Sequence, residues 1–205
     1  MNVVAIVDYG MCNLDSMARA VEENGGRPLV TDDPADLKDA THIILPGVGS
    51  FGEAMWNLSE RGFEQSLKKQ VIDDRVPFLG VCLGMQLLAE VGLEGGVTTG
   101  LGWIPGDVRR LIPANGDLRI PHIGWNEVHA SKEHALLHDI APGTDFYFVH
   151  SYHLCCRDQN DVVATTPYAG GFTSVICRDN ICGVQFHPEK SQRPGFQLLK
   201  NFLSM

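Results

Sequence analysis

The first half of the chain alternates short apolar runs with stretches whose apolar residues recur at helical spacing. The apolar runs are predicted to be strands, and they cover Val3–Val7, Pro28–Val30, Ile43–Leu45 and Pro77–Val81. The helical stretches begin at Leu14, at about Gly52 and at Leu83, and they end near Gly25, Asp73 and Glu90. Mostly apolar strands that alternate with helices indicate a parallel sheet covered on both faces.

The second half of the chain has a different pattern. Glycines cluster from Gly92 to Gly102, and the runs that follow are short and rich in β-forming residues. A closing helix is predicted over Pro194–Leu203, and a hairpin turn over Arg178–Asn180. We therefore expect a mixed or antiparallel sheet joined to the first. Its predicted strands are Trp103–Leu111, Ile120–Val128, Phe146–Tyr152, Val162–Ala164, Phe172–Cys177 and Ile181–Phe186.

Length and charge limit the class of protein. The 205 residues suggest a single α/β domain over 1–205, and a net charge of −9 with no block of Lys or Arg argues against binding to nucleic acid or to an anionic membrane. We find no basic-then-apolar leader and no apolar run of membrane-spanning length, so a cytoplasmic protein is expected.

The cysteines suggest no metal site. None of the six forms a C-x-x-C pair, and we expect them to be free thiols in a reducing compartment. A zinc site could be assembled from His150, His153, Cys155 and Cys156. Because neighbouring side chains on a strand alternate between faces, these four residues do not converge easily on one ion.

Cys82 lies where the predicted strand gives way to a helix, with Gly80 two residues before it and Gly84 two residues after. This is the glycine spacing of a nucleophile elbow, with sulfur in place of a serine hydroxyl. N–H groups and the dipole at the start of the helix favour the reactive thiolate. The alternative is a buried, inert cysteine, which the flanking glycines disfavour.

A candidate base for this nucleophile occurs near the C-terminus, in the His187–Pro188–Glu189 sequence. Alternation from Val184 predicts a strand, so His187 and Glu189 should project the same way. Pro188 disfavours helical geometry at the residue before it. Glu189 can then orient one imidazole nitrogen while the other faces Cys82, which gives a nucleophile, a base and an orienting group.

The loop Gly47–Gly52 spells G-x-G-x-x-G between a strand and a helix. On its own this pattern suggests a dinucleotide site, but the fingerprint belongs to a first strand, and here it follows the third. We favour half of an oxyanion hole instead. One N–H, from Val48 or from Gly49, would act together with the N–H of Leu83.

Several motifs together resemble a known family. The sequences around Cys82 and His187 resemble the two signatures of class I glutamine amidotransferases. Four further segments, over residues 8–10, 45–51, 121–126 and 149–152, are similar to the glutaminase subunit of imidazole glycerol phosphate synthase. The resemblance covers nearly the whole chain. One departure is Cys12, because the family usually has glycine before Asn13.

The resemblance implies a flavodoxin-like sheet with a mixed or antiparallel extension, and an enzyme that hydrolyses glutamine without a metal or a cofactor. It implies a heterodimer with a (β/α)8-barrel cyclase, which uses the ammonia to make imidazole glycerol phosphate in histidine biosynthesis. It also implies roles for further residues. Asn13 and Trp125 would lie near the interface, and the substrate would be bound by Gln86, Glu94, His150, Ser151 and Tyr152.

Three other hypotheses are compatible with these patterns. A paralogous amidotransferase could supply ammonia for an amidino-sugar of surface polysaccharide. An intracellular cysteine hydrolase of the peptidase type could use the same elbow, although there the base commonly follows the nucleophile, whereas Leu83 follows Cys82 here. A nucleotide-binding module could use the loop that begins at Gly47.

Overall fold

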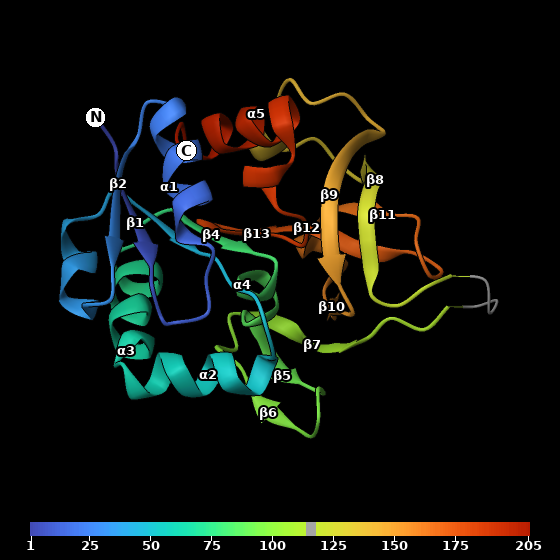
Figure 1. Cartoon of the computed structure of the whole chain (residues 1–205), viewed down its shortest axis with the longest axis horizontal. Coiled ribbons are helices and arrows are strands. Elements are labelled where there is room, and N and C mark those ends of the chain that lie inside the picture. The colour runs from blue at the N-terminus through green and yellow to red at the C-terminus, as the bar shows by residue number, and fades with distance from the viewer. Residues whose placement is uncertain (114–117) are drawn as a thin grey trace.

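The computed structural model describes residues 1–113 and 118–205. Most of the strands belong to one mixed sheet, which runs across the middle of the molecule (Figure 1). The strands are β1 (Val3–Val7), β2 (Arg27–Thr31), β3 (His42–Leu45), β4 (Phe78–Val81), β5 (Ala89–Gly92), β6 (Thr98–Thr99), β7 (Ile104–Arg110), β8 (His122–Ala130), β9 (Thr144–His150), β10 (Tyr152–Cys156), β11 (Val162–Thr166), β12 (Phe172–Arg178) and β13 (Ile181–Val184).

The helices lie mainly on the two faces of the parallel part of this sheet. In Figure 1, α1 and α5 lie above the strands, and α2 and α3 lie below them. The α-helices are α1 (Leu14–Glu23), α2 (Phe51–Glu60), α3 (Phe63–Leu67), α4 (Leu83–Gln86) and α5 (Gln192–Phe202). Shorter helical turns are Pro34–Asp39, Ala135–Leu137, Gln159–Asp161 and Pro188–Lys190, and a π-helical turn covers Lys68–Asp73.

The large sheet joins the two halves of the chain. Among the described residues it has nine strands in the order β2-β1-β3-β4-β13-β12-β11-β8-β9. The first five strands are parallel, and from β13 onward neighbours are antiparallel. The mixed extension and the β12–β13 hairpin are therefore confirmed. The pairing of β13 with β4 places the end of one next to the end of the other, because Val184 lies opposite Val81.

Alternation along the central strands fills two cores. In β1, Ala5 and Val7 belong to the cluster that also contains residues of α2 and α3, whereas Val4 and Ile6 belong to the cluster that contains residues of α1 and α5. All four side chains are fully buried. Burial on both faces is the reason why these strands are continuous apolar runs.

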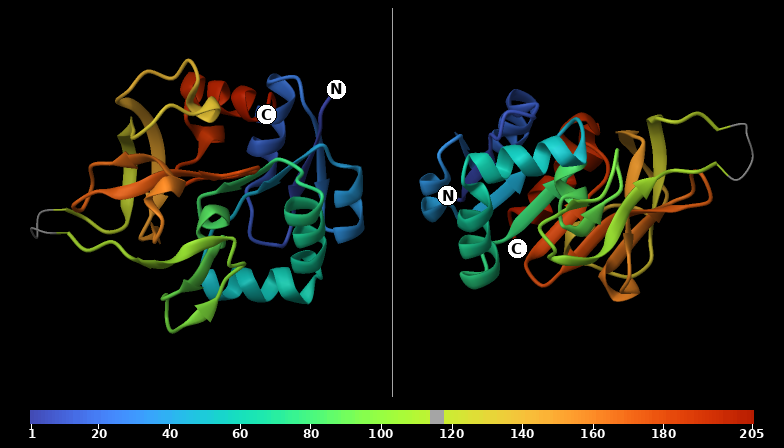
Figure 2. Two further views of the ribbon diagram at one scale, coloured as in Figure 1. Left: turned by 180° about the vertical axis from the view of Figure 1, so that it is seen from behind. Right: turned by 90° about the horizontal axis from the view of Figure 1, so that it is seen from below.

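A smaller sheet was not predicted. It has the order β10-β7-β5-β6 among the described residues, and it lies at one side of the large sheet, as the views from behind and from below show (Figure 2). Its first strand continues β9 after a break at Ser151, so the predicted strand Phe146–Tyr152 is in fact the end of one strand and the start of another.

The predicted helix from Leu83 to Glu90 is also shorter than expected. It ends after Gln86, and the chain then forms β5, in which Ala89 pairs with Ile104 of β7. Leu87, Leu88 and Ala89 are all fully buried, so this segment has no polar face to present to solvent. A continuous apolar run does not distinguish a buried helix from a buried strand.

The expectation that all cysteines are free thiols is wrong for one pair. Cys177 and Cys182 form a disulfide, and they lie directly opposite each other in the β12–β13 hairpin. Strand pairing brings their Cα atoms to 4.2 Å, and this proximity could not be inferred from the spacing of the cysteines alone. The other four cysteines are free.

No helix in the part of the chain that the structure describes is long and apolar enough to cross a membrane.

Candidate active site

Cys82 lies on a strained turn between β4 and α4. Its φ is 54° and its ψ is −108°, a conformation that residues with a side chain rarely adopt. The flanking glycines permit this turn. A Cβ on Gly80 would lie 2.6 Å from the carbonyl oxygen of Gly84, and a Cβ on Gly84 would lie 1.8 Å from that of Leu45. The backbone N–H of Cys82 donates to Val184 at 2.8 Å, which ties the turn to β13.

His187 follows β13 and is held by its backbone. Its N–H donates to the carbonyl of Tyr147 in β9, and its own carbonyl accepts from the Ser191 hydroxyl at 2.6 Å. The predicted strand does not continue to Glu189, because β13 ends at Val184 and Pro188 begins a 3₁₀ turn. His187 is extended, as the following proline requires. The turn brings Glu189 back, and its Oε1 lies 2.9 Å from Nδ1 of His187.

The surroundings of His187 favour its charged form. Burial opposes the charge, but Cys82 and Glu189 outweigh burial and raise the pKa of His187 to about 10. Its Nε2 is buried and has no hydrogen-bond partner within ordinary geometric limits among the described residues. Because Nδ1 is occupied by Glu189, Nε2 is the nitrogen that remains for proton exchange with the nearby thiol.

A cavity of about 310 Å³ opens beside this sulfur. Its size lies at the lower end of the range for small-molecule sites. The residues that line it include all of the predicted oxyanion and substrate residues. They are Val48, Gly49, Cys82, Leu83, Gln86, Glu94, Pro121, Val149, His150, Ser151 and Tyr152.

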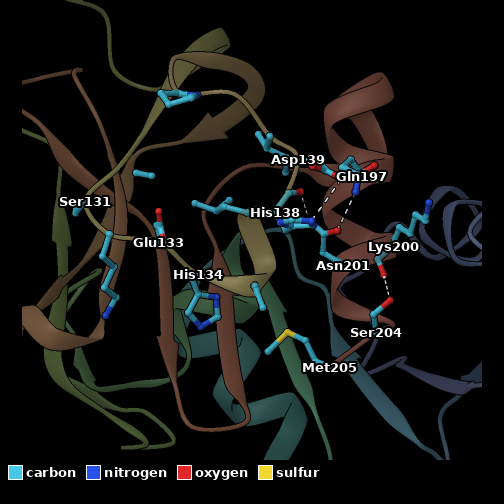
Figure 3. Close-up of a pocket in the computed structure, with 16 residues that line it drawn as sticks. Ser131, Glu133, His134, His138, Asp139, Gln197, Lys200, Asn201, Ser204 and Met205 are labelled. Carbon is cyan, nitrogen blue, oxygen red and sulfur yellow. Dashed lines mark hydrogen bonds and ion pairs between the residues drawn. The ribbon is translucent and has the colours of Figure 1, made fainter.

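A larger cavity of about 1120 Å³ lies elsewhere, between the segment 130–142 and helix α5 (Figure 3). Asn201 of α5 donates to the carbonyls of Leu136 and His138 along its wall. Cys82 does not line this larger cavity, whereas it does line the smaller one, so we assign the candidate active site to the smaller cavity.

The two candidate oxyanion donors of the glycine loop differ. The N–H of Val48 donates to the carbonyl of Met11 at 2.9 Å, so in this conformation it is already in use. Gly49 has a φ of 109° and lines the cavity. Leu83 is the first residue of α4, where a backbone N–H has no acceptor within the helix.

The predicted substrate residues have partners within the protein. Nε2 of Gln86 donates to the carbonyl of Tyr152 at 2.8 Å, and the carboxylate of Glu94 accepts from the N–H of Phe51 at 2.8 Å, at the start of α2. Both ring nitrogens of His150 are engaged, with the Tyr152 carbonyl and with His122. The His150 ring is therefore part of the wall.

The predicted interface residues are exposed. Asn13 immediately precedes α1 and its side chain makes no capping hydrogen bond, and Trp125 on β8 is 48% exposed. Cys12 contacts the end of β1 and the segment that follows β3, because its thiol lies 3.5 Å from the carbonyls of both Val7 and Pro46. Burial raises the pKa of Cys12 to about 11, so this thiol is neutral at pH 7.

Sequence analysis missed two residues of the site. Gln185 is fully buried, and its Nε2 lies 3.7 Å from the sulfur of Cys82. His122 lies next to His150, with 3.0 Å between the ring nitrogens. Both residues lie in segments that carry the family resemblance, Gln185 in the one around His187 and His122 in residues 121–126. A glutamine at the end of an otherwise apolar strand is a further signal.

One cluster could be considered for a metal. Among the described residues, ligand atoms of His134, Cys177 and Cys182 lie within 4.8 Å of one another. The two sulfurs are joined in the disulfide, and Nδ1 of His134 accepts from the N–H of Leu136. While the disulfide is formed, these three residues do not offer a set of free metal ligands.

The comparisons with known proteins agree with this geometry. The family described as glutamine amidotransferase class-I matches residues 5–205. The chain belongs to the class I glutamine amidotransferase family. Curated relatives support this assignment along the whole length, and they favour neither the cysteine hydrolase nor the nucleotide-binding hypothesis.

Each of three such relatives is named imidazole glycerol phosphate synthase subunit HisH. The protein of Moorella thermoacetica is 48% identical over 98% of this chain and 94% of its own length. That of Campylobacter jejuni is 46% identical, over 99% of this chain and 100% of its own length. That of Leptospira interrogans is 43% identical with the same coverage.

Solved structures confirm the amidotransferase fold. A crystal structure of a glutamine amidotransferase matches with a TM-score of 0.76 and 16% identity, over 98% of this chain and 99% of that one. PurLQS from Thermotoga maritima matches with a TM-score of 0.75 and 19% identity, over 100% of this chain and 99% of that one. The predicted α/β fold with its mixed extension is therefore confirmed.

Proposed function

We propose that this class I amidotransferase is the glutamine-hydrolysing subunit of imidazole glycerol phosphate synthase. The observation that carries the proposal is the combination of a cysteine on a strained elbow with a buried His–Glu pair beside one small cavity. The names of the relatives favour this synthase over an amidotransferase for an amidino-sugar.

In the first half-reaction, the Cys82 thiolate attacks the side-chain amide carbon of glutamine and a C–S bond forms. The carbonyl electrons move to oxygen, where the N–H groups of Leu83 and of Val48 or Gly49 would stabilise the negative charge. Removal of one such donor costs about 3–4 kcal/mol in other enzymes. His187 gives its Nε2 proton to the nitrogen as the C–N bond breaks and ammonia leaves.

In the second half-reaction, neutral His187 removes a proton from water, and the hydroxide attacks the thioester. Glutamate leaves and the thiolate–imidazolium pair is restored. Glu189 holds the ring and stabilises its cation in both steps. The balance is one glutamine and one water converted to one glutamate and one ammonia.

The Val48 N–H is bonded to Met11, so its use as an oxyanion donor requires the loop to change conformation. If the loop does not change, Gly49 is the remaining candidate. We infer that a partner protein promotes the donating form, and that glutaminase activity depends on that partner.

The partner would be a (β/α)8-barrel cyclase that takes the ammonia before it is protonated in bulk water. The exposed Asn13 and Trp125 are proposed to lie at this heterodimer interface. The cyclase would use the ammonia to close the imidazole ring in histidine biosynthesis, and neither a metal nor an organic cofactor is needed on this chain.

The test measures glutamate release by the chain alone and with the barrel subunit and its nucleotide ligand. Cys82→Ala should abolish release and covalent labelling by a glutamine-analogue electrophile, while Cys155→Ser should leave both unchanged. Normal turnover by Cys82→Ala would refute the nucleophile. Equal rates with and without the barrel would refute the dependence on a partner.

A further inference from the structure

Gln185 is a buried polar residue to which the mechanism above gives no role. It follows the last residue of β13, and its backbone N–H donates to Ser174 of β12 at 2.9 Å. Its side chain is fully buried, between Cys82 and Gln86. A buried amide in an otherwise apolar layer is costly unless its groups are hydrogen-bonded, so its contacts are informative.

The orientation of this amide follows from a backbone carbonyl. The Tyr152 carbonyl can only accept, so the Gln86 atom that faces it at 2.8 Å must be the NH₂ group. The same NH₂ group lies 3.1 Å from the Gln185 amide, which must therefore present its oxygen there. The NH₂ group of Gln185 then faces the sulfur of Cys82 at 3.7 Å.

The Tyr152 carbonyl also accepts from a second series of hydrogen bonds, which runs through His150, His122 and Asn126. Nδ1–H of His150 donates to Tyr152 at 2.9 Å, so Nε2 of His150 accepts from Nδ1–H of His122 at 3.0 Å. The remaining nitrogen of His122 then accepts from the Asn126 amide at 3.2 Å. Burial lowers the pKa of His150 to about 3 and that of His122 to about 4, so both rings are neutral at pH 7 and this order of protons is kept.

We propose that Gln185 is a positioning residue for glutamine hydrolysis, whose amide N–H holds Cys82 in the thiolate form while its oxygen fixes Gln86. An N–H bond to an anionic sulfur is stronger than one to a neutral thiol, so this contact favours the thiolate. This inference depends on the proposed function in one respect: the reaction that Gln185 assists is taken to be glutamine hydrolysis.

The oxygen of Gln185 has a separate consequence. Both of the hydrogen bonds of Gln86 described above use its NH₂ group. Its own oxygen therefore remains for the cavity that it lines. We assign to Gln86 the role of an acceptor for an N–H group of the substrate, with Gln185 maintaining that orientation.

The test compares two variants by the rate at which iodoacetamide alkylates Cys82 across pH. Gln185→Met removes both polar groups at similar volume, and Gln185→Glu keeps an acceptor for Gln86 but removes the donor to sulfur. Both should slow alkylation at neutral pH by about tenfold, with recovery at alkaline pH, which corresponds to the loss of about one hydrogen bond to a charged group. Gln185→Glu should retain a wild-type KM for glutamine, whereas Gln185→Met should raise it.

Ser174→Ala is the matched control, because Ser174 is also fully buried and its hydroxyl has no partner among the described residues. It should leave the alkylation profile unchanged. A wild-type profile in Gln185→Glu would overturn the proposal, even if Gln185→Met failed to fold. Alkylation needs neither glutamine nor a partner. Absence of glutaminase activity in the presence of the barrel subunit and its nucleotide ligand, together with the shifted profile, would therefore refute the proposed function and not this role.

Discussion

The molecule contains two buried histidine sites that respond to burial in opposite ways. His187 is 3% exposed and its pKa is raised to about 10, whereas His122 and His150, at 3% and 6% exposure, have pKa values lowered to about 4 and about 3. Burial disfavours the charged ring at all three positions. Of the three rings, only His187 has the Glu189 carboxylate and the Cys82 sulfur beside it, and these two groups raise its pKa.

The difference shows how the neighbouring groups set the protonation state of a buried histidine. The charged form of His187 is stabilised, and its Nε2 has no hydrogen-bond partner among the described residues, so this ring fits the proposed role of proton carrier. His122 and His150 use both nitrogens in hydrogen bonds, and both rings remain neutral. The three residues are all histidines and are buried to a similar extent, so their hydrogen-bonding and charged neighbours determine whether each ring is protonated.

The largest expected effect comes from removing the negative charge of Glu189, which lies beside His187. Glu189→Gln keeps an oxygen for Nδ1 but loses the charge that stabilises the imidazolium, so the pKa of His187 should fall. We expect kcat for glutamate release to decrease by about 10⁴-fold, as for the corresponding acid-to-amide change in related triads. The surface variant Glu133→Gln is the control. An unchanged kcat in Glu189→Gln would contradict this prediction, because it would mean that Cys82 is enough to keep the His187 ring protonated.

The two sites should also limit stability at opposite ends of the pH range. The pKa of His187 is raised above its ordinary value of 6.5, so its contribution is complete below pH 6.5 and is lost as the pH rises toward 10. The pKa values of His122 and His150 are lowered, so their contribution is present above pH 6.5 and is lost as the pH falls toward 3.

This prediction is checked by urea unfolding between pH 4 and pH 10. The free energy of unfolding should be highest near pH 6.5. His187→Gln should flatten the alkaline decline and leave the acid decline intact. The exposed control His138→Gln should change neither, and an alkaline decline that persists in His187→Gln would assign it to another group.

The smallest expected effect is a loss of stability when the hydrogen bond between the neutral rings of His122 and His150 is removed. His122→Phe preserves ring stacking on Tyr168 and Phe148 but leaves Nε2 of His150 without its donor. We expect the free energy of unfolding to fall by about 1–2 kcal/mol, because a buried acceptor loses its partner. His129→Gln on the surface serves as the control. A variant as stable as wild type would show that the bond between the two rings contributes nothing.

The sequence by itself determined the strands β1 to β4 of the parallel half and the sharp turn at Cys82. The turn at Cys82 needs small residues at Gly80 and Gly84, and this requirement is local, so it is visible in the spacing. The same holds for the hairpin between β12 and β13. Local sterics and the alternation of apolar residues are enough to predict such features.

Only the tertiary structure decided which distant residues surround the sulfur. The pairing of β13 with β4 brings Gln185 and His187 to Cys82, and it cannot be derived from either strand alone. The His122–His150 bond also depends on long-range register, because it joins β8 to β9. The 3₁₀ turn that returns Glu189 and the disulfide between Cys177 and Cys182 are local, and neither was predicted from the sequence. A local pattern specifies which face a side chain occupies, but the strand that lies opposite is selected by packing of the whole sheet.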